Sequence, residues 1–534
     1  MGLSSQQKFL PGLAPDYRPR RSEETVLFKV VAEHLETFLA LTEREGRGLP
    51  DYVNKEFHEF LKCGVLSHGF LRLKCDGCKH EMLVAFSCKK RGFCSSCGGR
   101  RMAETAAHLV DTVFPHVPVR QYVLSLPFPL RFLLAKQSKI QTLCLRIVHR
   151  AIGQFLKRKY KKLSGRKILA KDMKCGAVTI VQRFGDGLRL NPHFHMLFLE
   201  GVYTVGFDGK PRFHATPPPT DEEIQALVVT IAKRVIRALK RRGYLQDLEE
   251  GHTHVEYDEG DNAQEELFSH VQGASVGSRI ALGERKGQRV RRLGGVPGTG
   301  GSGTATLSGP RCAQASGFSL HADVAVKAQE RDKLEKLARY TARNAVSEER
   351  LSQSHDGSQL VYRLKRRYTD GTSHLLYTPM EFLEKLASLV PPPRAHLTRY
   401  FGILGPHDKH RSDVVPNPEP KPEKEETESD QDDESEFTKK KRMSWAQLLK
   451  RVFQIDIETC PSCGGTLKVI AAVKEPEVIK KILKHLKLPH EPPLIQPARA
   501  PPQGEFGFHS YSYSYSYSYS DNDNDNDNDY GQSR

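Results

Sequence analysis

The sequence has no apolar run near the roughly 20 residues that a membrane-spanning helix needs. Its first ten residues, MGLSSQQKFL, lack the apolar stretch of a secretory signal, and Gln6 breaks the myristoylation pattern, so we expect a cytoplasmic protein. A phosphate-binding Gly-Lys-Ser/Thr loop is also missing, because the glycine-rich segment within residues 284–316 ends without one. That segment is predicted to be a flexible insert or hairpin loop, and any cleavage chemistry is expected to run without a nucleoside triphosphate.

Acidic residues are too few to balance the basic ones. Lysine and arginine number 81 against 64 aspartates and glutamates, which gives a formal charge of +17. Such an excess favours a polyanionic partner, nucleic acid first. Basic residues gather at Lys157–Lys174 and at the end of a predicted helix over residues 221–242. A chain of 534 residues also exceeds one ordinary core, which predicts two to four domains.

The cysteines number 11 and occur in clustered pairs, which is typical of metal sites and not of a disulfide framework. The first two pairs have the spacing C-x2-C-x15-C-x2-C, within the window for a zinc site of four thiolates. The predicted ligands are Cys75, Cys78, Cys94 and Cys97. Cys63 and Cys88 lie nearby and could replace one ligand.

Basic side chains surround these cysteines, among them Lys89, Lys90, Arg91, Arg100 and Arg101. Because phosphate neutralisation supplies most non-specific affinity for DNA, the module is a candidate DNA-contacting element. The alternative is a structural zinc clip whose basic face is only solvated.

Two histidines flank one phenylalanine in the strand-like stretch LRLNPHFHMLFLEGVY. Side chains alternate on a strand, so His193 and His195 are predicted on one face and Phe194 on the other. Two imidazoles on one face make half of a divalent-metal site. The plainer reading is a solvated sheet face, and His252-Thr253-His254 shows how common the pattern is. The preceding stretch, residues 178–184, is predicted to pair with this strand as an antiparallel hairpin.

Further elements follow from apolar periodicity. Helical patterns cover residues 23–62 and 132–163, and residues 120–126 form a strand pattern. Residues 317–326 alternate as one half-buried strand, which leads into a helix over residues 327–344. Tyr340 lies near the end of that helix between Arg339 and Arg343, and Asn344 projects from the same face as Tyr340.

The C-terminal part begins with an acidic, proline-rich stretch that predicts a disordered linker. A helix is predicted over residues 444–453 and another over residues 474–486. Between them Cys460 and Cys463 form one further knuckle, which is a possible second zinc site only if other ligands complete it. His485 and His490 are conceivable partners. The final Ser-Tyr and Asp-Asn repeats cannot form a packed core.

Together these stretches resemble the HUH endonucleases, specifically the rolling-circle transposases of the insertion sequence ninety-one family and its common-region relatives. The matching phrases are FSCKKRGFCSSC, VQRFGDGLRLNPHFHMLFLEGVY, SRIALG, GFSLHADVAV, LARYTARNAVSEERL, RLKRRYTDGT with HLLYTP, LVPPPRAHLTRYFGILGPH and WAQLLKRVFQIDIETCPSCGG. They cover about residues 25–410 and 443–490. Family members with two tyrosines space them Y-x-x-x-Y; here Lys336 occupies the upstream position, which resembles the single-tyrosine branch.

The resemblance implies a mechanism. A divalent ion, Mg²⁺ or Mn²⁺, on His193 and His195 would polarise the scissile phosphate of single-stranded DNA, and Tyr340 would attack it to leave a 5′-phosphotyrosine. Gln182 is the first choice for a third metal ligand, with His321 and Asn344 as the others. Tyr400 is the rival nucleophile. The DNA contacts are assigned to Arg91, Arg100, Arg101, Arg339 and Arg343. Structural Zn²⁺ is expected in addition to the divalent ion.

The predicted fold class is α+β, an antiparallel HUH-endonuclease sheet with packed helices between N-terminal and C-terminal zinc modules. The predicted domains are an arm at 1–24, a helical zinc-binding domain at 25–112, the endonuclease domain at 113–410, the linker at 411–442, a CxxC module at 443–490 and a low-complexity tail at 491–534. The predicted function is a transposase acting on single-stranded element ends at the bacterial nucleoid. The alternatives are a plasmid replication initiator or relaxase, and a non-enzymatic zinc DNA-binding regulator.

Overall fold

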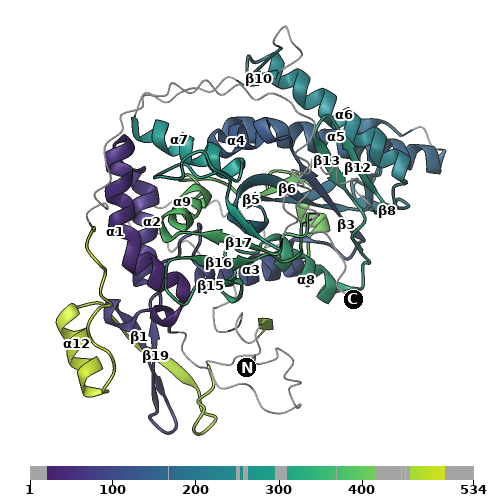
Figure 1. Ribbon diagram of the computed structural model, residues 1–534. Coiled ribbons are helices and arrows are strands. Elements are labelled where there is room, and N and C mark those ends of the chain that lie inside the picture. The colour runs from purple at the N-terminus through teal and green to yellow at the C-terminus, as the bar shows by residue number, and fades with distance from the viewer. Residues whose placement is uncertain are drawn as a thin grey trace, which may run out of the picture.

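The computed structural model describes residues 21–165, 168–247, 253–255, 263–294, 309–368, 370–416, 447, 451–452 and 458–499 (Figure 1). Several predicted segments therefore lie outside the described residues. They are residues 1–20 of the predicted N-terminal arm, His252, residues 295–308 of the glycine-rich segment, most of the acidic linker and of the helix predicted over 444–453, and the repeats after residue 499. Among the described residues, no helix combines the length and the apolar character that crossing a bilayer requires.

The centre of the molecule is an antiparallel sheet of seven strands. Its order is β12 (Cys312–Ala315), β13 (Phe318–His321), β3 (Val119–Ser125), β6 (Leu190–Leu199), β5 (Gly176–Phe184) and β18 (Thr398–Gly402), with β14 (Ala325–Val326) also pairing with β3. The predicted hairpin is confirmed, since β5 and β6 pair antiparallel with Gln182 opposite His193. The strand predicted over residues 120–126 is also present, as β3.

The strand predicted over residues 317–326 is interrupted, which corrects that prediction. Both β13 and β14 pair with β3, but residues 322–324 between them leave the regular ladder. The buried Arg120 guanidinium occupies this break, donating from Nη1 to the carbonyl of Ala322 at 2.7 Å and from Nε to Glu200 at 2.6 Å. A buried guanidinium needs such acceptors, so the irregularity satisfies a cation that the alternation pattern could not anticipate.

The two faces of the central sheet carry different cores, because successive side chains on each strand point to opposite sides. One face, with Tyr122, Phe194 and Phe198, is covered by α4 (Phe128–Lys136), α5 (Ser138–Ser164) and α6 (Asp221–Lys240). The other face, with Val178 and Leu197, is covered by α3 (Ser95–His108), the π-helical turn Leu109–Val113 and α8 (Arg331–Thr341). The helix predicted over residues 132–163 is thus two helices, divided at the extended Gln137.

A second core unites segments that were predicted to belong to separate domains. The N-terminal helices α1 (Val26–Gly46) and α2 (Asp51–Lys62) pack with α7 (Ala263–Val276), α9 (Pro379–Leu389) and a four-stranded sheet. That sheet has the order β11 (Arg291–Leu293), β17 (His374–Tyr377), β16 (Leu360–Arg363) and β15 (Leu351–Gln353). The predicted boundary at residue 112 therefore cuts through one apolar core. Sequence periodicity shows which face of a helix is buried, but not which element buries it.

Smaller elements complete this body. A three-stranded sheet has the order β4 (Met173–Lys174), β7 (Gly201–Val205) and β8 (Pro211–Ala215), and β9 (Leu245–Asp247) pairs with β10 (Thr253–Val255). Short helices are α10 (Arg411–Val414) and the 3-10 turns Ser22–Glu24, Leu66–His68, Ala170–Asp172, Asp186–Leu188 and Glu348–Arg350.

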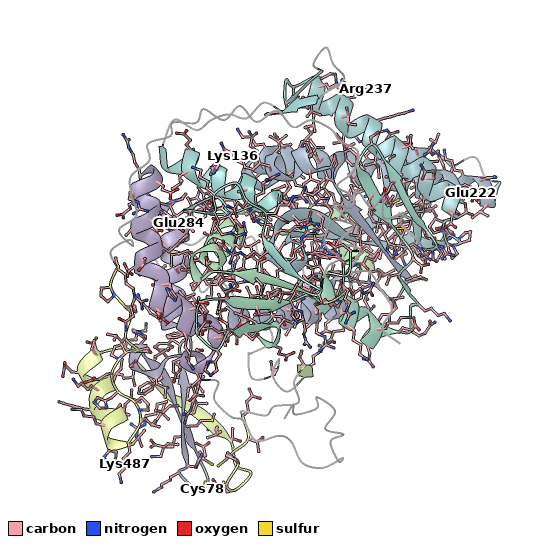
Figure 2. All side chains as sticks on the ribbon, viewed as in Figure 1. Cys78, Lys136, Glu222, Arg237, Glu284 and Lys487 are labelled. Atoms are coloured by element: carbon pink, nitrogen blue, oxygen red, sulfur yellow. The ribbon has the colours of Figure 1, made fainter. Side chains whose placement is uncertain are left out.

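A lobe projects from this body, and we call it the hairpin lobe. It comprises β1 (Phe70–Cys75), β2 (Glu81–Ala85), β19 (Leu467–Val473) and α12 (Pro476–His485), with the strand order β19-β1-β2 (Figure 1). Figure 2 places Cys78 and Lys487 on this lobe, away from the central sheet. The prediction of a separate C-terminal module at 443–490 is thereby corrected, since β19 is the partner of an N-terminal strand.

Candidate active site

His193 and His195 lie on β6, on the face of the central sheet that α8 covers. Their side chains project to the same side, and the two Nε2 atoms are 3.1 Å apart. The residues are only 6% and 1% exposed, which excludes the plainer reading of two histidines on a solvated sheet face. Two nitrogens on adjacent positions of one ion, each about 2.1 Å from it, would lie about 3 Å apart. The observed separation fits a shared metal.

Burial keeps both imidazoles neutral. It lowers the pKa of His193 to about 4, with a smaller opposing effect from the hydrogen bond to the Asn191 carbonyl. Burial, followed by the charge of the neighbouring His193, also holds the pKa of His195 well below its ordinary value. Neutral imidazole is the form that binds metals, so protons do not compete with a cation here near pH 7.

Hydrogen bonds fix the ring orientations. His193 Nδ1 lies 2.8 Å from the Asn191 carbonyl oxygen and must donate to it, which leaves the Nε2 lone pair directed at His195. His195 Nδ1 lies 2.9 Å from the side-chain amide nitrogen Nε2 of Gln121 on the neighbouring strand β3. When the amide is turned so that its oxygen faces Nδ1 instead, it accepts the proton of Nδ1 and frees Nε2 as a second ligand, the arrangement usual for metal-binding histidines. Gln121 therefore holds His195 in position.

Sequence reasoning missed Gln121. A signal was available, because its strand RQYVLSL places one amide among buried apolar residues, and a buried amide needs a partner.

Gln182 is well placed to be a third ligand. It lies directly opposite His193 on β5 and is 3% exposed. Its Nε2 donates to the backbone carbonyl of Thr341 at 3.3 Å, at the end of α8. Its Oε1 is buried and accepts no hydrogen bond from a described residue. An unsatisfied buried oxygen is costly, and a cation beside the two imidazoles would satisfy it.

The other two candidate ligands are placed differently. His321 ends β13 opposite Val123 of β3, which puts it on the same sheet face as His195, and it is half-buried. Asn344 donates from Nδ2 to the carbonyl of Phe93 at 3.2 Å, so its amide is engaged with the cysteine-rich segment. Of the three candidates, Gln182 alone lies directly opposite a histidine of the pair.

Tyr340 lies beside the histidines. Leu334 and Ala338 bury one side of α8 against the sheet, and the Tyr340 ring meets the His195 ring edge-on, with centroids 6.2 Å apart. Lys336, one turn earlier, is exposed. Two cations stand over the tyrosine ring, Arg343 at 5.1 Å and Lys365 at 4.9 Å from its centroid. The Tyr340 ring thus lies beside both the candidate metal site and positive charge that suits a phosphate.

Tyr400 occupies a different part of the sheet. It lies on the edge strand β18, opposite Val178, and β5 separates that strand from β6. Val178 is four residues along β5 from Gln182, which corresponds to about 13 Å. The Tyr400 ring instead packs near Arg411, whose guanidinium carbon is 5.7 Å from its centroid. This placement favours Tyr340 as the nucleophile.

The arginines assigned to DNA contact differ in their hydrogen bonds and in their exposure. Arg101 donates to the carbonyls of Lys89 and Lys90, and Arg91 donates to the carbonyl of Ala395 at 2.6 Å. Arg100 and Arg339 are half-buried. Lys365 was not predicted, and its stretch RLKRRYTDGT carried no local signal that it would return to Tyr340.

The cysteines form two clusters, and the predicted set of four is divided between them. Cys94 and Cys97 meet Cys63 and Cys88, while Cys75 and Cys78 meet Cys460 and Cys463, and within each cluster all sulfurs lie within 4.8 Å of one another. This corrects the predicted ligand partners. The spacing rule compares cysteines near in sequence, whereas antiparallel pairing of β1 with β19 brings the fourth pair from far along the chain.

The first cluster lies at the start of α3. The sulfur of Cys97 lies 3.7 Å from that of Cys63 and 3.5 Å from that of Cys88. Two thiolates on one tetrahedral zinc would lie about 3.8 Å apart, so the observed distances are close to those of a zinc site. The backbone N–H of Lys89 donates to the Cys97 sulfur at 3.2 Å. Cys94 N-caps α3, which packs on α8, and Gly98 lies so close to Asn344 that a Cβ there would come within 2.5 Å. The cluster therefore supports the helix that carries Tyr340.

We expect Cys94→Ser to remove one equivalent of zinc and to destabilise the chain by several kcal/mol, because metal binding at such a site contributes about 10–16 kcal/mol in small zinc peptides. Metal analysis and thermal unfolding measure both effects. Cys144→Ser, at a buried cysteine of α5 outside both clusters, is the matched control. Full zinc content in Cys94→Ser would contradict the assignment.

Comparison with known proteins gives two family matches. Residues 176–412 match the transposase family model Y2_Tnp, and residues 30–126 match the transposase zinc-binding domain model Zn_Tnp_IS91. No curated protein and no solved structure matches the chain. The first range contains the two histidines and Tyr340, and the second contains all four cysteines of the first cluster. These matches imply a DNA-cleaving, DNA-binding enzyme with structural zinc, and the chain belongs to the transposases of the insertion sequence ninety-one (IS91) family.

Proposed function

We propose that this transposase nicks and rejoins single-stranded DNA through a covalent 5′-phosphotyrosine on Tyr340. The observation that carries the proposal is the contact of the Tyr340 ring with His195, with ring centroids 6.2 Å apart, on a sheet face where two neutral imidazoles converge. A nucleophile next to a candidate cation site is the arrangement that phosphoryl transfer needs. The HUH fold and the rolling-circle pathway belong to this proposal.

Because one phosphoester bond replaces another, the energy of the phosphodiester is kept in the protein–DNA link. The phenolic oxygen of Tyr340 bonds to phosphorus while the bond from phosphorus to the 3′ oxygen breaks. The phenol proton is lost to water, and the leaving 3′ oxygen takes a proton to become a hydroxyl. Attack by a 3′-hydroxyl on the phosphotyrosine reverses the exchange and joins strands. No nucleoside triphosphate is consumed in either direction.

The residues of the site have separate roles in the proposed reaction. His193, His195 and Gln182 would hold the divalent ion, Mg²⁺ or Mn²⁺, and Gln121 orients His195. When bound, that ion supplies Lewis-acid polarisation of the scissile phosphate. Arg343 and Lys365 stand over Tyr340 and would bind the phosphate oxygens. Arg339 adds charge on the same helix, while Arg91, Arg100 and Arg101 would contact the DNA backbone from the cysteine-rich segment.

Labelled single-stranded oligonucleotides from the element ends, incubated with the full chain and Mg²⁺ or Mn²⁺, test the proposal. A denaturing gel should show a shifted protein–DNA adduct and a shorter product whose 3′-hydroxyl a polymerase extends. The same sequence as a blunt duplex is the control, and we expect much less adduct from it. Tight binding without any adduct would instead favour a non-enzymatic regulator.

Gln121→Ala should raise the Mn²⁺ concentration for half-maximal cleavage by about 10–100-fold, because loss of an outer partner to a metal-binding histidine has that effect. The rate at saturating Mn²⁺ should change much less, which separates a positioning role from general damage. Gln141→Ala, which removes another buried amide from α5, is the matched control. An unchanged Mn²⁺ dependence would refute the role of Gln121.

A further inference from the structure

The second cysteine cluster joins the two ends of the chain. The Cys75 and Cys463 sulfurs are 3.5 Å apart, as are those of Cys78 and Cys460. All four sulfurs lie within 4.8 Å of one another, with Cys75 and Cys460 buried and the other two exposed. These distances are again close to the separation of two thiolates on one tetrahedral zinc, which is about 3.8 Å. The zinc-binding family match ends at residue 126, so it contains only two of these four cysteines.

Both halves of the cluster have the local backbone of a metal knuckle. The N–H of Gly77 donates to the Cys75 sulfur, and the N–H of Gly465 donates to the Cys463 sulfur, each at 3.4 Å. Gly464 has φ +74°, and a Cβ on Gly465 would lie 3.0 Å from the Cys75 sulfur. The glycines after Cys463 thus allow the tight turn and the close approach of the two knuckles.

The surrounding core is shared between the same two segments. β1 and β2 alone would form an isolated hairpin, which is marginally stable at best. β19 pairs with β1 from Phe70 opposite Val473 to Cys75 opposite Leu467. Leu73 packs with Leu467 next to the cysteines, and Phe70 packs with Val473 and residues of α12. The hairpin lobe therefore has no complete core without the C-terminal residues.

Contacts outside the lobe hold the C-terminal part at two further places. Arg451 pairs with Asp111 and, at 2.7 Å, with Glu335 on α8, the helix of Tyr340. At the other end, the N–H of Gln496 donates to the Ala32 carbonyl at 3.0 Å and Arg499 pairs with Glu33 at 2.9 Å, both on α1. Gln496 and Arg499, which lie in the stretch predicted as a low-complexity tail, thus make polar contacts with the N-terminal helix.

We propose that Cys75, Cys78, Cys460 and Cys463 bind a second zinc ion, and that this zinc fastens residues 458–499, the C-terminal strap, to the N-terminal module. The acidic linker then closes a loop between two parts of one zinc site instead of separating two domains. The hairpin lobe folds only when both ends of the chain are present. This inference does not depend on the chemistry assigned to Tyr340.

Zinc content is the first test. The full chain should hold two zinc ions, and the variant Cys460→Ser/Cys463→Ser should hold one. Cys312→Ser, at a half-buried cysteine of β12 outside both clusters, should keep two. The zinc retained by the double variant reports that its first cluster is folded. One zinc in the wild-type chain, or two in the double variant, would overturn the proposal.

Strap retention is the second test. A site-specific protease sequence placed within residues 417–446 of the full chain allows the linker to be cut after folding. The C-terminal fragment should still co-elute with the rest of the wild-type protein in size-exclusion chromatography. In the Cys460→Ser/Cys463→Ser background, at least about nine-tenths of it should separate, because binding of metal at such sites drives folding. A fragment that stays bound without the second zinc would show that the other contacts suffice to hold the C-terminal strap and would overturn the proposal.

A conservative variant guards against non-specific damage. Cys460→His keeps a zinc ligand, since three cysteines and one histidine also make a structural site. It should restore the second zinc and retain the cut fragment. If it binds two zinc ions but releases the fragment, zinc occupancy and attachment of the strap are independent, and the proposal fails.

Discussion

Tyr340→Phe is expected to abolish both the covalent DNA adduct and the nick, with a fall in cleavage rate of at least about three orders of magnitude. The substitution removes one oxygen from a half-buried ring and leaves its packing against His195 intact. Water does not replace the phenol, because the site's cations are arranged around the tyrosine ring. The denaturing gel measures both products, and mass spectrometry of the DNA-linked peptide should identify Tyr340.

Tyr400→Phe is the matched control, since it makes the same change on the same sheet face at the edge strand. It should form the adduct at the wild-type rate. An adduct mapped to Tyr400, or an undiminished adduct from Tyr340→Phe, would move the nucleophile elsewhere. Lys336 is no substitute nucleophile, because an amine would give an acid-labile phosphoramidate and its side chain is exposed one turn away.

The strands that build the candidate site could be predicted from the sequence because their information is local. Alternation along β6 places His193 and His195 on one face, and the short loop before it determines an antiparallel hairpin with β5. These two facts already put Gln182 near the histidines. The same reasoning could not determine exact registry, and so it could not separate Gln182 from His321, which shares the sheet face but ends a strand on the far side of β3.

The grouping of the cysteines was not predictable in the same way. Two CxxC pairs within 25 residues look like one site by spacing, but Cys75 and Cys94 belong to different clusters. The deciding interaction is the pairing of β1 with β19, a contact between segments almost 400 residues apart along the chain. Local spacing has no information about such a contact. Cys63 and Cys88, which stand outside the CxxC pairs, were the available hint, because each needed other cysteines to complete a metal site.

The same limitation applies to the domain boundaries. A composition change at the acidic linker marks a stretch without apolar periodicity, but it does not show whether the flanking parts fold apart. Here the part after the linker supplies β19 and α12 to an N-terminal sheet and core. Likewise α1 and α2 complete a core with α7 and α9. In this protein, cores are assembled from distant segments, so linear boundaries describe composition better than they describe folding units.

The double variant His193→Ala/His195→Ala is expected to lower cleavage by about 10²–10³-fold or more, since losing metal polarisation removes several kcal/mol of transition-state stabilisation. Binding of single-stranded DNA should persist, because it rests on cationic groups spread over Lys157–Lys174 and Lys233–Arg242.

Titrating Mn²⁺ into wild-type protein should give a midpoint that is nearly constant between pH 6 and 8, since burial keeps the pKa of His193 at about 4.

Omitting Mg²⁺ and Mn²⁺ should reproduce the double variant and is a cleaner comparison than a strong chelator, which would also remove zinc from the cysteine clusters. His58→Ala, on a partly exposed histidine of α2, is the control for loss of an imidazole. Because two buried rings are removed, the thermal midpoint and zinc content of the double variant must be measured beside its activity. If the folded, zinc-loaded variant still nicks at the wild-type rate, the divalent ion binds elsewhere. Tyr340 would then act next to two histidines whose role is only to pack against it.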